Sequence, residues 1–378
     1  MINNTDILKD AKNYCDKHIR PYANDFDEDG YIPIKTIKQL AQKSYLSASI
    51  PKEYGGLGLT PLEFGHFIEG FGKACCNIRT LITVNSIVGE TILKYGTEFQ
   101  KNNLLVDLSK GNKIAAFALS EPEIGSDAKN IKTTYEKIDD KYILNGKKKW
   151  ISFGALADYI LIIARKEEEI TAFLVSSNAK GIEVKEAKGM MANRASFLAE
   201  ISIDNVEINE DNILGPIGGG FNHIVSYALD YGRYCVAWGG LAIMQECVDS
   251  LVTYSRNRKQ FGTKIYKNQL IKGMIGDAVT KLHAGRSLCV NAAKLRTEGK
   301  EDSIIETSIA KYFTSKAAVD ISNKNLQING AHGFSNKSSA SRLYREAKIL
   351  EIIEGTSQIQ QQIIANYGLR KYYNNNLI

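Results

Sequence analysis

Glu354 is the residue of this sequence whose surroundings point most directly to chemistry. It stands in the segment IIEGTSQIQ, where two isoleucines precede it and Gly355 follows it. An apolar setting disfavours the ionised carboxylate and raises its basicity, which suits the removal of a weakly acidic proton. The same segment also suits a helix boundary, because Gly355, Thr356 and Ser357 are residue types that end one helix and cap the next.

Two segments in the middle of the chain offer hydroxyl groups and an aromatic ring to a ligand. FALSEPEIGSD, which begins at Phe117, places Ser120 and Ser126 on a turn directly after a predicted strand. These hydroxyls and the backbone amides of the turn suit a polar ring edge or a pyrophosphate. Trp150 and Ser152 end another predicted strand and present an aromatic face beside a hydroxyl. An ordinary connection between strands and a core tryptophan fit the same residues.

A third segment, RNRKQFGTKIYKNQ, carries basic side chains next to Phe261 at a break between helices. A guanidinium with an aromatic neighbour suits a pyrophosphate and a flat heterocycle. The glycine-rich GPIGGG, which begins at Gly215, has neither dinucleotide nor phosphate-loop spacing, and no alternation of strands and helices surrounds it. We therefore interpret GPIGGG as a linker.

Other kinds of catalytic site have little support in the sequence. The six cysteines show no C-x-x-C spacing and the five histidines form no metal-binding pair, so we expect reduced thiols and no metal site. The G-x-S-x-G turn of many serine hydrolases is missing as well. A bound cofactor or a carboxylate is then the expected source of chemistry.

The composition is that of a globular protein. Of the 378 residues, 44% are hydrophobic and 24% charged, and the purely apolar stretches are too short to span a membrane. The N-terminus lacks the apolar core of a secretory signal, so we expect a cytoplasmic protein. A net charge of +6 suits an anionic partner such as coenzyme A or an acidic carrier protein. Aromatic and basic residues are not interleaved as in nucleic-acid platforms, so we expect no nucleic-acid partner.

Hydrophobic periodicity divides the chain into three predicted domains, over residues 1–112, 113–221 and 222–378. The first has the three- and four-residue spacing of helices. The second has short β-branched runs separated by turns, with a tight hairpin turn predicted at Asn145 and Gly146. The third returns to long helical patterns. We predict a mainly α protein with a central β domain.

Six segments resemble, in order, the signatures of the acyl-CoA dehydrogenase family over nearly the whole chain: SEPEIGSD, NGKKKWIS, RKQFG, QINGAHGF, REAK and IIEGTSQIQ. The resemblance implies an N-terminal α-helical domain, a middle β-barrel and a C-terminal four-helix bundle. It also implies FAD as the cofactor and assembly into a homodimer or homotetramer. The reaction it implies is removal of an α-proton by a base while flavin N5 takes a β-hydride.

The resemblance also assigns roles to individual residues. Glu354 falls at the catalytic base, and Gly232 stands where some relatives carry a glutamate instead, so no second base is expected. The residues expected to contact the substrate are Ser126, Asp230, Arg233 and Gly355. Those expected to contact the cofactor are Phe117, Leu119, Ser120, Ser126, Trp150, Ser152, Thr356 and Gln358. Those expected to reach the FAD of a neighbouring subunit are Arg258, Phe261, Gln269, Gln327, Gly330 and Ala331.

The helical segment LDYGRYCVAWGG looks like that of the branch that makes hydroxymalonyl or methoxymalonyl units on acyl carrier proteins for polyketide biosynthesis. This likeness favours a short, oxygenated acyl group on a carrier protein. Trp238 in this segment either restricts the acyl pocket or packs in the core. One alternative is a short- or branched-chain acyl-CoA dehydrogenase of catabolism that passes electrons to an electron-transfer flavoprotein. Another is a family member that binds FAD or an acyl thioester without turnover.

Overall fold

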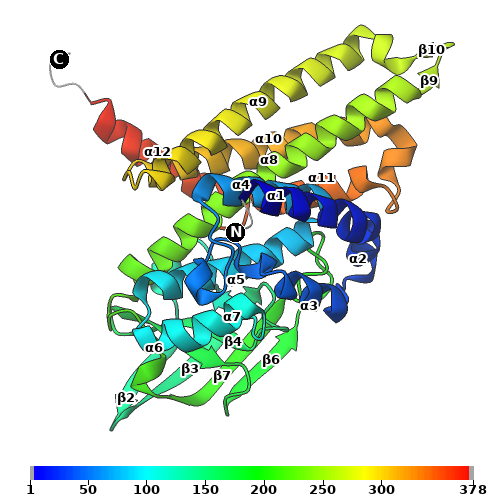
Figure 1. Cartoon of the computed structure of the whole chain (residues 1–378). Helices are drawn as coiled ribbons and strands as arrows, with labels where there is room; N and C mark the ends of the chain where they lie inside the picture. The colour runs from blue at the N-terminus through cyan, green and yellow to red at the C-terminus, as the bar shows by residue number, and fades with distance from the viewer. Residues whose placement is uncertain (1–3, 374–378) are drawn as a thin grey trace.

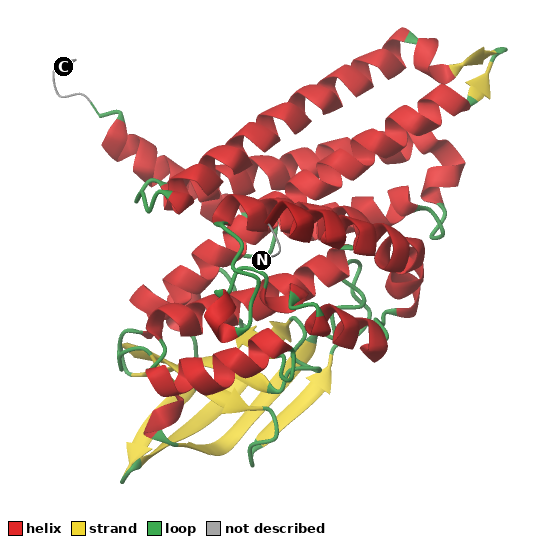
Figure 2. Cartoon of the chain, in the orientation of Figure 1, coloured by secondary structure: helices red, strands yellow, loops and turns green. Residues whose placement is uncertain are grey.

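The computed structural model describes residues 4–373. A β-sheet forms one end of the molecule, long C-terminal helices form the other, and N-terminal helices lie between them (Figure 1). Figure 2 shows the strands gathered almost entirely in that one sheet. The predicted order of helices, β domain and helices is confirmed.

The N-terminal part is helical, and its central helix is α5, Cys76–Tyr95, of whose 20 residues 15 are buried. On one side α5 packs against the sheet, where Asn85 Oδ1 accepts a hydrogen bond of 3.1 Å from the Ala115 N–H. On the other side it packs against the C-terminal helices. Polar groups on α5 are therefore placed to take part in a site between these layers. The other helices of this part are α1 (Asn4–Tyr14), α2 (Ala23–Asp29), α3 (Ile34–Gln42), α4 (Pro61–Ala74), α6 (Glu98–Gln100) and α7 (Val106–Lys110).

The middle part is one sheet in which β6, β7, β3, β2, β4, β5 and β8 follow one another, and β1 pairs with β4 in parallel. Its central strands β4 and β5 are buried along most of their length, since helices and the opposite face of the sheet cover them. The strands are β1 (Ala115–Ala118), β2 (Thr134–Ile138), β3 (Lys141–Ile151), β4 (Tyr159–Lys166), β5 (Glu169–Ser176), β6 (Ile182–Glu186), β7 (Ala199–Ile208) and β8 (Ile213–Leu214).

The hairpin turn predicted at Asn145 and Gly146 is wrong. Strand β3 runs through both residues, and the chain reverses earlier, between Ile138 and Lys141, where Asp139 takes a φ of +53°. Gly146 instead lies at an irregularity in the pairing of β3 with β7. A Cβ at this position would come within 2.6 Å of Thr133 Oγ1, so close approach of the backbone explains the glycine.

The C-terminal part is built on α8 (Ser226–Asn257), α9 (Gln269–Thr297) and α10 (Ser303–Phe334), followed by α11 (Ser339–Leu350) and α12 (Ser357–Lys371). The short strands β9 (Lys259–Gln260) and β10 (Thr263–Lys264) join α8 to α9. The helix over Gly220–Asn257 is long and apolar enough to cross a membrane by length and composition, but 72% of its most apolar window is buried within the protein. This burial is what the core helix of a bundle requires.

A buried ion pair fixes the loop that follows β1. Lys148 Nζ on β3 donates to Glu121 Oε1 over 2.8 Å and to the Leu119 carbonyl over 3.1 Å, and both charged side chains are almost fully buried. Glu121 also accepts hydrogen bonds from Lys132 N–H and from the N–H and hydroxyl of Thr133. Burial lowers the pKa of Lys148 to about 8 although Glu121 opposes the shift. Every oxygen of this carboxylate is thus satisfied inside the protein.

Replacing Lys148 by Met should lower the free energy of unfolding by about 3 kcal/mol, because the Glu121 carboxylate would stay buried without its counter-charge. Chemical denaturation of the purified protein measures this loss. Lys147→Met is the matched control, since Lys147 is exposed on the same strand and its loss should change stability by less than about 0.5 kcal/mol. Equal effects of the two substitutions would contradict the assigned role of the pair.

Candidate active site

Glu354 lies in the turn of residues 351–356 between α11 and α12. Its φ is +56° and that of Gly355 is +88°, so two consecutive residues adopt the left-handed region. For a glutamate this conformation costs roughly 1–3 kcal/mol and persists only where the surroundings hold it. Thr356 then caps α12 by accepting a hydrogen bond from the Ile359 N–H over 3.3 Å, so the predicted helix boundary is present together with the exceptional backbone.

Side chains from three helices hold this turn. Arg233 Nε on α8 donates to the Glu354 carbonyl over 3.1 Å, and Lys311 Nζ on α10 donates to the Gly355 carbonyl over 2.7 Å. Gln360 Nε2 on α12 donates to both carbonyls, over 3.1 and 3.2 Å. The strained backbone is therefore fixed from several directions, and the direction of the Glu354 side chain is fixed with it.

The Glu354 carboxylate rests against α8 at Gly232. A Cβ at position 232 would lie 2.3 Å from Glu354 Oε2, closer than any side chain could approach. Oε2 is itself buried and has no hydrogen-bond partner in the described structure. Burial raises the pKa of Glu354 to about 7, although the positive charges of Arg233, Lys311 and Arg79 pull it down. The result is an unengaged carboxylate that can accept a proton near neutral pH.

Two other predicted residues on α8 have structural partners. Asp230, expected at the substrate, is buried and its Oδ2 accepts a hydrogen bond of 2.7 Å from Arg296, while its Oδ1 has no partner in the described structure. Trp238 is fully buried, and a Cβ at Gly65 of α4 would lie 2.2 Å from its ring. The indole therefore packs between α4 and α8. The sequence left two interpretations of Trp238, restriction of the acyl pocket or packing in the core, and the structure supports core packing.

The segments expected around the flavin meet at the ends of β1 and β3. The Lys149 N–H donates to the Ser120 carbonyl over 2.9 Å, which places the loop after β1 beside the end of β3. Trp150 has a φ of +63° and is 48% exposed, so its ring is turned away from the sheet core. An uncovered aromatic face beside the partly buried hydroxyl-bearing Ser120 and Ser152 fits a flat heterocycle with polar edges. Of the remaining residues of this group, Leu119 is buried, Phe117 and Thr356 are partly buried, and Ser126 and Gln358 are exposed.

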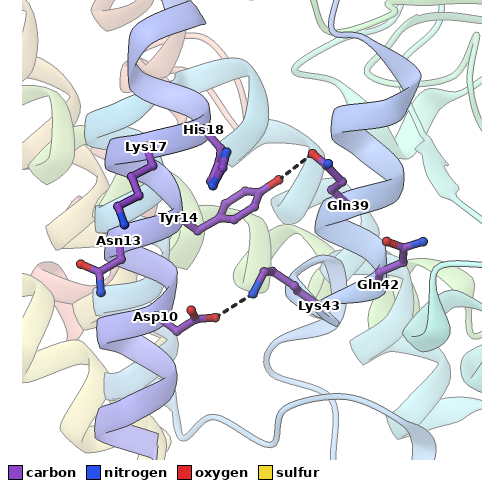
Figure 3. A pocket seen from close by; sticks show the side chains of 8 residues that line it. All are labelled: Asp10, Asn13, Tyr14, Lys17, His18, Gln39, Gln42 and Lys43. Carbon is purple, nitrogen blue, oxygen red and sulfur yellow. Dashed lines mark hydrogen bonds and ion pairs between the residues drawn. The ribbon is translucent and has the colours of Figure 1, made fainter.

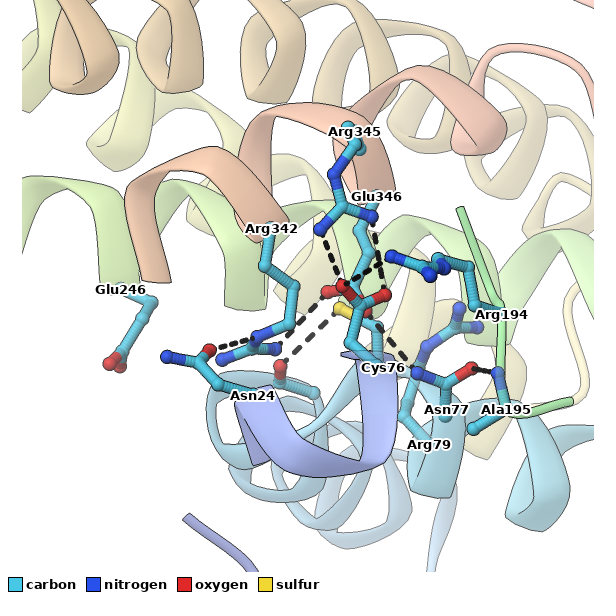
Figure 4. Close-up of polar contacts among 12 residues, drawn as sticks. Asn24, Cys76, Asn77, Arg79, Arg194, Ala195, Glu246, Arg342, Arg345 and Glu346 are labelled. Carbon is cyan, nitrogen blue, oxygen red and sulfur yellow. Dashed lines mark hydrogen bonds and ion pairs between the residues drawn. The ribbon is translucent and has the colours of Figure 1, made fainter. Parts of the chain in front are cut away.

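A buried polar network ties this region to the helix that precedes Glu354 (Figure 4). Asn77 on α5 accepts a hydrogen bond from the Ala195 N–H over 3.2 Å and donates to Glu346 on α11 over 3.4 Å. Glu346 also pairs with Arg342 at 3.3 Å, and the Ser196 carbonyl accepts from the Phe153 N–H at 2.7 Å. The REAK motif, which contains Glu346, is thus part of the frame that sets α11 relative to the end of β3.

The residues expected at a neighbouring subunit's FAD lie elsewhere. Phe261 is fully exposed at the β9–β10 hairpin, which stands at the opposite end of the bundle from α12 (Figure 1). The other members of this group are exposed at the ends of α8, α9 and α10: Arg258, Gln269, Gln327, Gly330 and Ala331. Gly330 has a φ of +59° and kinks α10. A single chain does not bring these residues to Glu354, and their role at a second subunit stays a prediction.

A groove between α1 and α3 contains a second cluster of titratable side chains (Figure 3). Lys43 Nζ pairs with Asp10 at 3.0 Å, and the Tyr14 hydroxyl donates to Gln39 over 3.4 Å. The Lys43 and Asp10 side chains are largely exposed, and Asp10 also accepts a hydrogen bond of 2.6 Å from the Tyr45 hydroxyl. The groove contains none of the residues predicted for catalysis, so we interpret it as a solvated surface.

Comparison with known proteins extends this picture over the whole chain. Models of the three acyl-CoA dehydrogenase domains match it, the N-terminal domain over residues 3–112, the middle domain over 116–206 and the C-terminal domain over 218–369. The fold and site are those of an FAD-dependent oxidoreductase acting on CH–CH groups. The chain belongs to the acyl-CoA dehydrogenase family.

Individual relatives cover nearly the full length of the protein. "3-(aryl)acrylate reductase" of Clostridium sporogenes is 35% identical over 96% of this chain and 98% of its own. The mitochondrial short-chain specific acyl-CoA dehydrogenase of Mus musculus is 34% identical over 97% and 90%. The structure of butyryl-CoA dehydrogenase from Megasphaera elsdenii superposes with a TM-score of 0.93 at 31% identity, over 98% of this chain and 100% of its own.

Two further relatives bear on the partners. "Caffeyl-CoA reductase-Etf complex subunit CarC" of Acetobacterium woodii is 32% identical over 97% of this chain and 98% of its own. FkbI, for biosynthesis of the methoxymalonyl extender unit of the Fk520 polyketide, is 27% identical with a TM-score of 0.86, over 97% and 98%. The predicted likeness to the extender-unit branch is therefore distant, and the coenzyme A alternative is better supported.

Removing the positive charge of Lys311 should move the acid limb of the pH–activity profile. If Glu354 is the base, as the sequence predicts, activity requires its ionised form and is lost as the pH falls through its pKa of about 7. Because Lys311 lowers that pKa, Lys311→Met should shift the limb to higher pH, by about half a unit to one unit. The measurement is kcat/KM for butyryl-CoA across pH 5.5–9. Lys316→Met, on the exposed side of α10, is the control; an unmoved limb in Lys311→Met would contradict the electrostatic role.

Proposed function

We propose that the protein oxidises the Cα–Cβ bond of a short acyl-CoA, with Glu354 as the catalytic base. The observation that carries the proposal is the buried, unpartnered Oε2 of Glu354, held against Gly232 with a pKa of about 7. Such a carboxylate can take the α-proton of a thioester and release it again at neutral pH. Bound FAD supplies the acceptor for the hydride that leaves the β-carbon.

The residues around Glu354 perform the positioning that this reaction needs. Arg233, Lys311 and Gln360 bind the backbone carbonyls of the turn and leave the carboxylate itself free. Their hydrogen bonds fix the side chain before the substrate arrives, so little rearrangement is needed during proton transfer. A family member that only binds its ligands would not need a strained turn held by cationic side chains. This observation argues against the non-catalytic alternative.

Coenzyme A is the favoured carrier of the acyl group. The relatives with 31% identity or more named above include a short-chain specific acyl-CoA dehydrogenase and a butyryl-CoA dehydrogenase, whereas the extender-unit enzyme is less similar. Burial of Trp238 between α4 and α8 also removes the reason for expecting the indole to restrict the pocket. An acyl carrier protein is the second candidate, and comparing kcat/KM for one acyl group on both carriers tests the choice.

An electron-transfer flavoprotein is the proposed electron partner. The proposal is supported by the relative named for its complex with Etf. Three exposed apolar side chains at the β9–β10 end of the bundle, Phe261, Leu270 and Phe334, support assembly into a homodimer or homotetramer, since a neighbouring subunit would cover them. We propose a cytoplasmic location on the sequence expectation alone.

Replacing Glu354 by Gln should lower kcat for butyryl-CoA by about 10³-fold or more, because the amide keeps the shape but cannot accept the α-proton. Anaerobic bleaching of the flavin band by butyryl-CoA measures the step directly. Glu351→Gln is the matched control, since Glu351 lies in the same turn and pairs with Lys348 instead of the site. Turnover within about threefold of the unmodified protein would show that Glu354 is not the base.

A further inference from the structure

Arg79 is a buried cation whose charge no residue of the described chain neutralises. It lies on α5 and is only 1% exposed. Its Nη2 donates to Thr80 Oγ1 over 3.0 Å, but its Nε and Nη1 are buried and have no hydrogen-bond partner in the described structure. Two other arginines differ from Arg79, since the buried Arg342 pairs with a carboxylate at 3.3 Å and the partly buried Arg296 pairs with one at 2.7 Å.

The contrast is visible around the REAK network. Figure 4 shows Arg79 beside Asn77 and Glu346, yet no interaction joins its guanidinium to either. A buried guanidinium without a counter-charge is strongly unfavourable, and an apolar side chain would fill the same volume at lower cost. A bound molecule that supplies the missing acceptor atoms would stabilise the buried Arg79 guanidinium, as expected of a ligand site.

The guanidinium lies on the same face of α8 as the catalytic base. A Cβ at Gly239 would lie 3.1 Å from Arg79 Nε and 3.3 Å from its Cζ, whereas a Cβ at Gly232 would meet the Glu354 carboxylate. The two glycines are two helical turns apart, so the base and the guanidinium meet α8 about 10 Å apart along one face. Both positions lack a side chain where a functional group approaches the helix.

Polar side chains of α5 also lie next to Arg79, facing the part of α8 between Gly232 and Gly239. Thr80 accepts from Arg79 through its hydroxyl, and Thr83, one turn further along α5, lies next to Cys235 of α8. Arg79 is also close enough to Glu354 to lower the pKa of that carboxyl. The end of the site beyond the base is therefore cationic and polar, whereas the pocket for a purely aliphatic acyl chain is lined by apolar groups.

We propose that Arg79 binds the far end of the acyl chain and that the preferred substrates are acyl-CoA thioesters whose short chain ends in a carboxylate. This inference rests on the proposed function and specifies its substrate class. The span of about 10 Å between the two contacts on α8 suits a short chain, such as the five carbons of a glutaryl group. The unpartnered Nε and Nη1 leave charged N–H donors available to that carboxylate.

The test compares charged and neutral thioesters of matched length on the FAD-loaded protein. We expect kcat/KM for glutaryl-CoA to exceed that for pentanoyl-CoA by about 100-fold, with succinyl-CoA and adipyl-CoA in between. This comparison needs no substitution, so it stays decisive even if a variant fails to fold. Equal use of the charged and neutral members, or a preference for pentanoyl-CoA, would overturn the assignment of Arg79 while leaving acyl-CoA oxidation in place.

A substitution locates the preference at Arg79. Arg79→Met should lower the ratio of kcat/KM for glutaryl-CoA to kcat/KM for pentanoyl-CoA by about 100-fold. Loss of the Arg79 charge also raises the pKa of Glu354, but this effect acts on both thioesters alike and cancels in the ratio. Arg286→Met is the control, because Arg286 pairs with Glu69 on α4 and its loss should leave the ratio unchanged. An unchanged ratio in Arg79→Met would overturn the proposal. Absence of turnover with every thioester, or turnover that survives Glu354→Gln, would instead overturn the proposed function and this inference with it.

Discussion

The close approach of the Glu354 carboxylate to Gly232 is the contact on which the rest of the site depends. The carboxylate occupies the space that any side chain at position 232 would need, so a base at 354 and a side chain at 232 exclude each other. The turn after α11 also points the Glu354 side chain back toward α8, and it does so with a left-handed backbone at Glu354 and Gly355. The hydrogen bonds from Arg233, Lys311 and Gln360 follow from that requirement, because a conformation this unfavourable needs holding.

The electrostatics of the site reflect two opposing effects on the pKa of Glu354. Burial favours the neutral form of Glu354, while Arg233, Lys311 and Arg79 favour its anion, and burial prevails to leave a pKa of about 7. A more exposed carboxylate would be too weak a base for an α-proton, and a carboxylate buried without the cations would stay protonated at neutral pH. Arg233 and Lys311 are themselves satisfied by backbone carbonyls, so they tune the base without forming an ion pair that would block it.

The sequence was sufficient for the order of the domains, because helical and strand periodicity is a local signal. An acid among apolar residues is also a local signal and singled out Glu354, whose role as the base stays a prediction. The sequence failed at Asn145 and Gly146, where a dipeptide typical of a turn lies inside β3. Glycine is required at position 146 because the backbone passes too close to Thr133 for a side chain. The sequence could not decide the environment of Trp238, since burial between α4 and α8 depends on residues distant in the sequence. The positioning residues Lys311, Arg296 and Gln360 gave no local signal either, because their partners come from other helices.

Helix α5 shows how specificity and chemistry can be separated in this fold. Its Asn85 bonds to the sheet, its Asn77 bonds to both the segment after β6 and α11, and its Arg79 faces α8. Two of these polar residues hold the layers together, so their replacement would disturb the whole site. Arg79 has no such structural partner in the described chain beyond Thr80, and it lies two helical turns along α8 from the base. If Arg79 binds the end of the acyl chain as proposed, one residue of α5 selects the substrate, while the residues that hold the base lie on α8, α10 and α12. Arg79 then acts on the base only through its charge, which lowers the pKa of Glu354.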